Sequence, residues 1–249
     1  MIITIAMREV HSLFLSPLAW SILAVTQFIM GYLFLGQLDM FLQIQSRLVA
    51  LNDAPGLTEI VVTPLFANAA LILLLVIPLI TMRIISEERR TQTLSLLLSA
   101  PISVTEIILG KFLGVLIFIA ILLLLIALMP FSLLLGGTLD YGMVASAFLA
   151  LFLLLASFAS AGLFMSTLTG QPTIAAISTF GVLLMLWIID WSADFSEAGS
   201  VFSYLSILNH YRSLLEGVFK SSDIVYYLLF ITTFLTLAIR RLNADRLQY

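Results

Sequence analysis

Long uncharged stretches dominate the sequence and predict helices that cross a membrane. A bilayer core of about 30 Å requires roughly 20 apolar residues in an α-helix, so each long interval without Asp, Glu, Lys or Arg is a candidate span. Such intervals lie at about residues 17–38, 65–82, 112–135, 143–166, 173–189 and 224–239. The fourth and fifth come from one uncharged run, which the turn-forming residues 167–173 divide. The pattern therefore predicts an all-α membrane protein, a single transmembrane domain over residues 1–249 with six transmembrane helices.

The composition supports this membrane assignment and excludes several classes of function. Hydrophobic residues make up 61% and charged residues 10% of the chain, whereas a soluble domain carries about 25% charge. No basic stretch is interleaved with aromatic side chains, so no nucleic acid is expected as a partner. The chain has no cysteine and no Gly-x-x-x-x-Gly-Lys-Ser/Thr motif. We therefore expect no catalytic residue, no metal site and no bound cofactor, and no enzyme activity of the chain by itself.

Lysine and arginine residues are unevenly distributed between the segments that connect the spans. If the N-terminus is cytoplasmic, the inner segments hold Arg8, Arg83, Arg89, Arg90, Lys111, Arg240, Arg241 and Arg246, and the outer segments hold only Arg47, Arg212 and Lys220. Positively charged connecting segments tend to stay in the cytoplasm. The sequence therefore predicts a multi-pass membrane protein with both termini cytoplasmic.

Residues 2–14 precede the first span with an amphipathic pattern. The apolar positions are Ile3, Ala6, Met7, Val10, Leu13 and Phe14, and the polar face holds Thr4, Arg8, His11 and Ser12. Pro17 separates this segment from the first span, so we predict an interfacial elbow helix on the cytoplasmic surface, with Arg8 and His11 on its polar side. The alternative is a simple extension of the first span.

A second apolar segment, residues 198–219, is too short to span a membrane. It predicts an outer re-entrant or interfacial pair of half-helices between the fifth and sixth spans. His210 lies at its middle, with only Glu216 near it in the sequence. A lone histidine with one acidic neighbour is more typical of a polar interface than of a metal or proton site.

The predicted cytoplasmic loop, residues 83–111, has the richest pattern of polar residues. Ser86 is a candidate helix cap, and Glu87 and Glu88 would then lie in the first turn, where the helix dipole favours negative charge. The remaining positions of the predicted helix, about residues 86–99, include Arg89, Arg90, Thr91, Thr93, Leu94, Leu97 and Leu98. After Pro101, the capping box Ser103–Glu106 begins a further helix that leads into the third span. The two readings are a docking surface for a cytoplasmic partner, or a solvated hairpin whose leucines lie on lipid.

The same loop resembles the signature loop of type-2 ABC transporter permeases. The resemblance rests on Ser86-Glu87-Glu88-Arg89-Arg90-Thr91-Gln92-Thr93-Leu94-Ser95-Leu96-Leu97-Leu98-Ser99-Ala100-Pro101 and on Gly110-Lys111 at the third span. The family usually has glycine at the position of Gln92 and glutamate at the position of Ser95. The elbow helix, six spans, re-entrant pair and tail extend the resemblance over the whole chain, and the turn at residues 166–171 looks most like the gliding-motility branch.

The resemblance implies a permease subunit in a cell membrane, the inner membrane of a bacterium, that works with a separate ABC ATPase. Two ATPase copies would bind ATP and Mg²⁺, and the helix of residues 86–99 would dock into a groove on each. A second permease copy or a sister permease would complete an export pathway, with membrane lipid around it and an extracytoplasmic accessory protein as a further possible partner. The identity of the substrate does not follow from the sequence.

Two other classes of function stay open at this point. The first is a force-transmitting membrane subunit that drives an extracytoplasmic partner and moves no substrate, as relatives in the gliding branch suggest. The second is an ATP-independent channel or carrier, which rests on the six spans alone. No Asp, Glu, Lys or Arg lies inside the predicted spans, which counts against an ion-coupled carrier.

Overall fold

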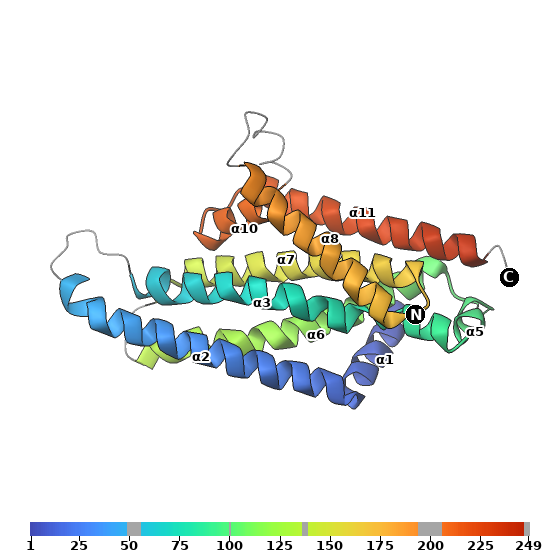
Figure 1. Cartoon of the computed structure of the whole chain (residues 1–249), viewed down its shortest axis with the longest axis horizontal. Helices are drawn as coiled ribbons and strands as arrows, with labels where there is room; N and C mark the ends of the chain where they lie inside the picture. Colours follow the sequence, from blue (N-terminus) through green and yellow to red (C-terminus); the bar gives the residue numbers. More distant parts are fainter. Residues whose placement is uncertain (49–55, 100, 136–138, 194–205, 247–249) are drawn as a thin grey trace.

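The computed structural model describes residues 1–48, 56–99, 101–135, 139–193 and 206–246, and these form helices without any strand (Figure 1). The helices are α1 (Ile2–Leu15), α2 (Pro17–Leu48), the π-helical turn η1 (Thr58–Val62), α3 (Thr63–Thr81), α4 (Ser86–Arg90), α5 (Leu94–Ser99), α6 (Val104–Ser132), the 3₁₀ turn η2 (Leu133–Leu135), α7 (Tyr141–Leu168), α8 (Pro172–Ala193), α10 (Ile207–Leu215) and α11 (Ser221–Arg246). The predicted all-α class is therefore confirmed for the described residues.

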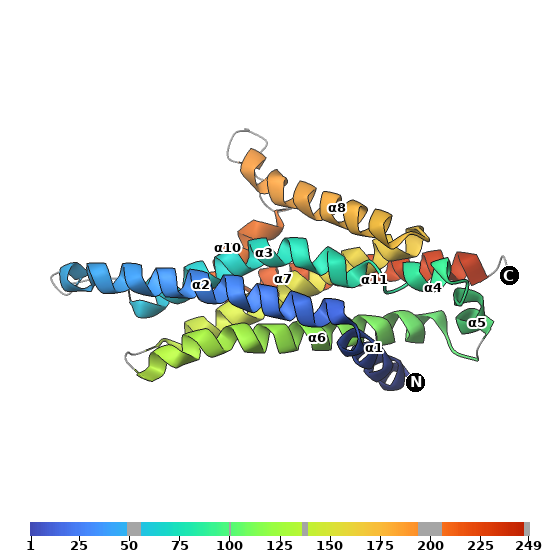
Figure 2. The ribbon, with the colours of Figure 1, turned by 60° about the horizontal axis from the view of Figure 1, so that its bottom comes forward.

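The long helices run side by side along the long axis of the molecule, with α7 at their centre (Figures 1 and 2). Helix α7 packs against α3, α6, α8, α10 and α11. The short helices α1, α4 and α5 gather at one end, where α11 also finishes. We call this the charged end, because it carries Arg8, Glu9, Arg83, Glu87, Glu88, Arg89, Lys111 and Asp245. The other half of the molecule, where the end of α2, the turns η1 and η2 and helix α10 lie, we call the opposite end.

Five segments are long and apolar enough to cross a membrane. They are Pro17–Gln45, Thr58–Arg90, Val104–Ser132, Tyr141–Leu168 and Ser221–Arg246. The segment predicted as the fifth span lies in α8, whose described apolar part, Pro172–Ile188, is shorter than the others. Five of the six predicted spans are therefore matched by a long apolar helix, and six spans stay a prediction.

Several predicted spans are only the middle parts of longer helices. Helix α2 continues past Asp39 to Leu48, because the Asp39 carboxylate accepts a hydrogen bond of 2.8 Å from Gln43 one turn later and does not end the helix. Helix α11 has 26 residues in place of the 16 predicted, and so is about 39 Å long. Charged residues mark where a helix leaves the apolar zone, but the backbone hydrogen bonds continue beyond them.

The capping box before the third span is confirmed. The Ser103 Oγ accepts a hydrogen bond of 3.1 Å from the Glu106 backbone N–H, and the Glu106 carboxylate accepts one of 3.1 Å from the Ser103 backbone N–H. These bonds begin α6 eight residues before the predicted start of the span at residue 112.

The loop helix predicted over residues 86–99 is two helices, and that prediction is wrong. Helix α4 ends in a Schellman motif: the Thr93 N–H donates to the Glu88 carbonyl at 2.9 Å and the Gln92 N–H donates to the Arg89 carbonyl at 3.2 Å. This motif requires a left-handed residue, and Gln92 has φ 58°. The predicted cap at Ser86 is also wrong, since Ser86 is the first helical residue and its hydroxyl donates to the Met82 carbonyl.

Small residues of α7, among them Ser157, Ala161 and Gly162, are buried within this chain. A Cβ added at Gly162 would lie 2.1 Å from the Thr81 Oγ1 of α3 and 3.2 Å from the Thr179 Cγ2 of α8. Gly162 thus lets α3, α7 and α8 meet at one point. Gly181 on α8, in contrast, is exposed and has open space around its α-carbon, so it takes no part in this close contact.

The predicted helix before the first span is α1, and it packs against α6. Ser16 is extended between α1 and α2, as expected from Pro17. A Cβ added at Gly110 would lie 2.7 Å from the Ile5 Cβ, and one at Gly114 would lie 2.7 Å from the Glu9 Cβ. These glycines lie one turn apart and allow the backbones of α1 and α6 to approach closely.

Replacing Gly110 with alanine is expected to lower stability by about 1–3 kcal/mol, because the added methyl group forces α1 away from α6. Thermal unfolding of the detergent-solubilised protein, followed by circular dichroism, measures this. The matched control is Gly36→Ala on α2, where no atom lies within 4 Å of the added Cβ. Equal midpoints for the two variants would contradict the close α1–α6 contact.

Candidate functional site

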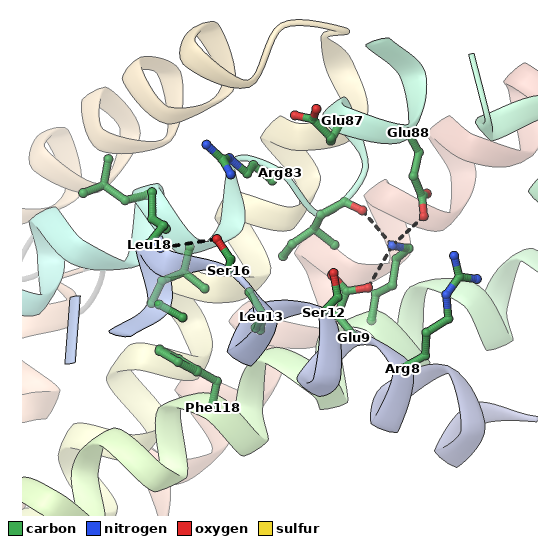
Figure 3. A pocket seen from close by; sticks show the side chains of 15 residues that line it. Arg8, Glu9, Ser12, Leu13, Ser16, Leu18, Arg83, Glu87, Glu88 and Phe118 are labelled. Carbon is green, nitrogen blue, oxygen red and sulfur yellow. Dashed lines mark hydrogen bonds and ion pairs between the residues drawn. The ribbon is translucent and has the colours of Figure 1, made fainter. Parts of the chain in front are cut away.

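A buried lysine connects three helices at the charged end. The Lys111 ammonium on α6 lies 3.1 Å from the Glu9 Oε2 of α1 and 2.9 Å from the Glu88 Oε1 of α4 (Figure 3). It also donates a hydrogen bond of 2.8 Å to the Ile84 carbonyl in the turn between α3 and α4. An ammonium group has three N–H donors, and each has an acceptor here. We call Glu9, Lys111 and Glu88 the lysine triad.

A second ion pair connects α4 to the end of α11. Arg89 pairs with Asp245, and its guanidinium also donates to the Thr167 carbonyl at 2.9 Å, where α7 ends. Arg241, one turn before Asp245, lies 3.7 Å from the same carboxylate. Arg89 therefore holds α4 against both α7 and α11.

The turn that enters α4 is fixed by the hydroxyl of Ser166 on α7. The Ser166 Oγ accepts hydrogen bonds of 3.0 Å from the backbone N–H groups of both Ile85 and Ser86. It lies 3.2 Å from the Met82 carbonyl, to which it donates. Ile85, Ser86 and Ser166 are all buried. The start of α4 therefore has little freedom to move independently of α7.

The far side of the loop is exposed. The exposed residues are Arg90, Thr91, Gln92, Thr93, Ser95, Leu96 and Ser99, which we call the loop tip. Leu96 is 71% exposed, whereas Leu94 is buried in the core. The Thr91 and Thr93 hydroxyls lie 3.0 Å apart and bond back to carbonyls of α4, so the tip has a fixed conformation.

The residues predicted for the site thus fall into two groups. Ser86, Glu88, Arg89 and Leu94 anchor the loop to the helix bundle, whereas Arg90, Thr91 and Thr93 lie on its exposed tip. Glu87 is half-buried and Leu97 partly buried, and the side chain of Leu98 lies outside the described residues. On α1, Arg8 and His11 are exposed, as expected for a polar face.

Four anchoring residues were not among the predicted site: Glu9, Lys111, Ser166 and Asp245. A signal for Lys111 was present in the sequence, since it is a charged residue between two glycines spaced four apart at the start of a span. Its partners lie 102 and 23 residues away in the sequence, and no local pattern pairs them. A single sequence therefore does not show that Lys111 pairs with Glu9 and Glu88.

A polar cluster at the opposite end also differs from expectation. His210 on α10 is buried, its Nδ1 lies 2.7 Å from the Asp223 Oδ1 of α11, and its ring stacks on Tyr226 at 4.2 Å. The acidic neighbour is therefore Asp223, not Glu216. Among the described residues no group of three or more His, Cys, Asp or Glu side chains could hold a metal ion. The first half of the predicted re-entrant pair, residues 198–205, lies outside the described residues.

Helix α10 is held by two tyrosine hydroxyls and one serine. The Tyr211 hydroxyl donates to the Phe66 carbonyl at 2.7 Å, and Tyr227 of α11 donates to the Ile207 carbonyl at 2.9 Å. Ser146 of α7 donates to the Leu214 carbonyl at 2.5 Å. Burial raises the pKa of the Tyr211 hydroxyl, so it stays a neutral donor.

The family model described as "ABC-2 family transporter protein" matches residues 3–247, nearly the whole chain. The chain belongs to the ABC-2 transporter family. It is a multi-pass membrane protein and a permease subunit of an ABC transporter. ABC-2 permeases work with a cytoplasmic ATPase subunit and are not themselves the ATPase. No curated protein matches the chain.

Reversing the charge of Glu88 is expected to destabilise this ABC-2 permease far more than the same change at Glu87. Glu88→Lys brings a second cation against Lys111, which is 5% exposed, whereas Glu87 has no ion pair among the described residues. Breaking a buried ion pair costs about 3 kcal/mol or more. The lysine triad therefore gives Glu88 a structural role that Glu87 lacks.

The measurement is the amount of monodisperse protein in detergent together with its unfolding temperature, for both single variants at equal expression. Glu88→Gln is the milder variant, since it removes charge without adding repulsion. Its unfolding temperature is expected to lie between those of Glu87→Lys and Glu88→Lys. Identical behaviour of Glu87→Lys and Glu88→Lys would contradict a structural role for the triad.

Proposed function

We propose that this permease couples ATP hydrolysis by two copies of a separate ATPase to export of a substrate, with the loop tip as the surface that docks on the ATPase. The observation that carries the proposal is the contrast within one short loop. Its tip is exposed and has a fixed conformation, while its base is tied by ion pairs and hydrogen bonds to α1, α6, α7 and α11. A solvated hairpin needs no such anchoring.

The anchoring provides a route for motion from the loop tip into the membrane. A push on α4 acts on α6 and α1 through the lysine triad and on α11 through the pair of Arg89 with Asp245. It acts on α7 through Ser166 and the Thr167 carbonyl. Because packed helices move as rigid elements, these links would convert movement of an ATPase into a shift of several helices together.

Export also requires a second permease copy or a sister permease. Large apolar side chains are exposed on α2 and α8, among them Phe28, Tyr32, Ile177 and Met185. Such exposed apolar side chains fit either lipid or another permease. We propose that α8 is the fifth of six spans, that α1 is an interfacial elbow helix and α10 part of a re-entrant pair, and that both termini are cytoplasmic in the inner membrane of a bacterium.

The second candidate is a force-transmitting subunit that moves an extracytoplasmic partner and transports nothing. The same anchored loop supports it, and it accords with the resemblance to the gliding-motility branch. Flux of a substrate into or out of proteoliposomes that contain the permease and its ATPase separates the two: ATP-driven flux supports export, and ATP hydrolysis without any flux supports force transmission.

The orientation can be tested by labelling single cysteines, since the chain has none of its own. Gln92 in the loop tip and Lys220 before α11 are both exposed and belong to opposite ends of the bundle. An impermeant thiol reagent added to intact cells is expected to label Lys220→Cys and to spare Gln92→Cys, which becomes reactive after lysis. The reverse pattern would overturn the orientation.

The coupling role predicts that Leu96→Asp combined with Arg90→Glu leaves the amount and stability of the permease unchanged, because both side chains are exposed. ATPase activity of the reconstituted complex is expected to fall to that of the ATPase alone, since an apolar contact is lost and a charge is reversed at the interface. The control is Lys220→Glu at the opposite end, measured at matched protein levels. Unchanged stimulation by the Leu96/Arg90 variant would rule out the loop tip as the docking surface.

A further inference from the structure

A cavity of about 350 Å³ lies beside the lysine triad, between α1, the start of α2, the end of α3 and α4 (Figure 3). We propose that it binds the headgroup of a membrane phospholipid that carries a phosphodiester and a primary ammonium. Its volume is at the lower end of the range for small-ligand pockets, roughly 300–1,000 Å³, and so suits a headgroup-sized ligand. The inference concerns the permease alone and does not depend on the loop tip.

The lining of the cavity combines polar and apolar side chains. Its polar residues include Arg83, Glu87, Glu88, Ser12 and Ser16, and its apolar residues include Leu13, Leu18, Leu79 and Phe118. A soluble polar metabolite does not need such an apolar wall. A phospholipid does, because the glycerol and the first carbons of its acyl chains follow directly on the charged headgroup.

The position of the cavity matches the headgroup level of a bilayer. Its lining includes Ser16 and Leu18, at the junction where α1 passes into α2, the first candidate span. Trp20 lies beside this junction, is exposed, and donates its indole N–H to the Phe14 carbonyl at 2.8 Å. Tryptophan is enriched at the membrane–water interface, and exposed Ile3, Met7 and Leu15 give α1 apolar area for the same layer.

The charges of the cavity favour a zwitterion over an anion. Its lining includes three cations (Arg8, Arg83 and Lys111) and three anions (Glu9, Glu87 and Glu88). Lys111 is fully used by its three acceptors, whereas Arg8, Arg83 and Glu87 form no ion pair among the described residues. Two free guanidiniums for a phosphodiester and one free carboxylate for an ammonium are thus present in the lining of the same cavity.

The free Glu87 carboxylate in the cavity lining favours a primary ammonium over a quaternary one. Glu87 is half-buried and forms no ion pair among the described residues, so its carboxylate gains from a charged hydrogen-bond donor in the cavity. A primary ammonium supplies three N–H donors, whereas a quaternary choline headgroup supplies none.

The test is native mass spectrometry of the full-length permease after exchange into mixed vesicles of phosphatidylethanolamine, phosphatidylcholine and phosphatidylglycerol, followed by controlled delipidation. We expect phosphatidylethanolamine to be retained in preference to the other two lipids. Arg83→Gln is expected to lower its retention by about tenfold, as loss of one charge-assisted hydrogen bond implies. Glu87→Gln is expected to abolish the preference over phosphatidylcholine, with some lipid still bound.

The matched control is Arg240→Gln, which removes the same charge from an exposed position on α11 outside the cavity. It is expected to leave the retention of all three lipids unchanged. Glycerophosphoethanolamine, which has the same headgroup without acyl chains, distinguishes a lipid from a soluble ligand. If it competes as well as the lipid, the ligand is soluble. Equal retention of the three lipids, preference for phosphatidylglycerol, or indifference to Arg83→Gln would each overturn the proposal.

Discussion

One buried ammonium group determines how the charged end of this permease is built. Lys111 lies on the buried side of α6. A buried cation is tolerated only with hydrogen-bond acceptors placed around it. The chain supplies them from three separate places, the carboxylates of Glu9 and Glu88 and the Ile84 carbonyl. The elbow helix, the turn after α3 and helix α4 must therefore all be in position before Lys111 is satisfied. Assembly of this end is for that reason cooperative.

The ion pair of Arg89 with Asp245 extends the same arrangement to the far end of the sequence. Helix α4 has only five residues and could not be a stable helix in water by itself. Its rigidity comes from Glu88 on one side, Arg89 on the other and Ser166 beneath its first turn. The two neighbouring glutamates thus have different roles. Glu88 maintains the fold, whereas Glu87 contributes charge to a cavity wall.

Local patterns in the sequence were sufficient for features made by neighbouring residues. The capping box at Ser103, the break at Pro17 and the uncharged cores of five spans are of this kind, because hydropathy and capping act within a few residues. The left-handed backbone conformation of Gln92 was harder to predict from the sequence. A glycine there would have indicated a helix end, but a glutamine usually continues a helix, so one loop helix was predicted where two exist.

The pairing of Lys111, Arg89 and His210 lay beyond such reasoning, since each partner is a single charged residue on another helix. Hydropathy identifies which charges lie near a membrane boundary, but many combinations of them are compatible with the same spans. Only the packing of α1 on the glycines of α6, and of α10 on α11, decides which pairs form.

The contact between Trp20 and Phe14 gives the chain an intrinsic optical probe. The Trp20 indole bonds across the junction of α1 and α2, and its ring meets the Phe14 ring edge to face at 5.8 Å. Emission from an indole shifts in wavelength when its hydrogen-bond partner or its exposure to water changes. With the two other tryptophans, Trp187 and Trp191, replaced by phenylalanine, fluorescence would follow the angle between the elbow and the first span during ATP turnover without any attached dye.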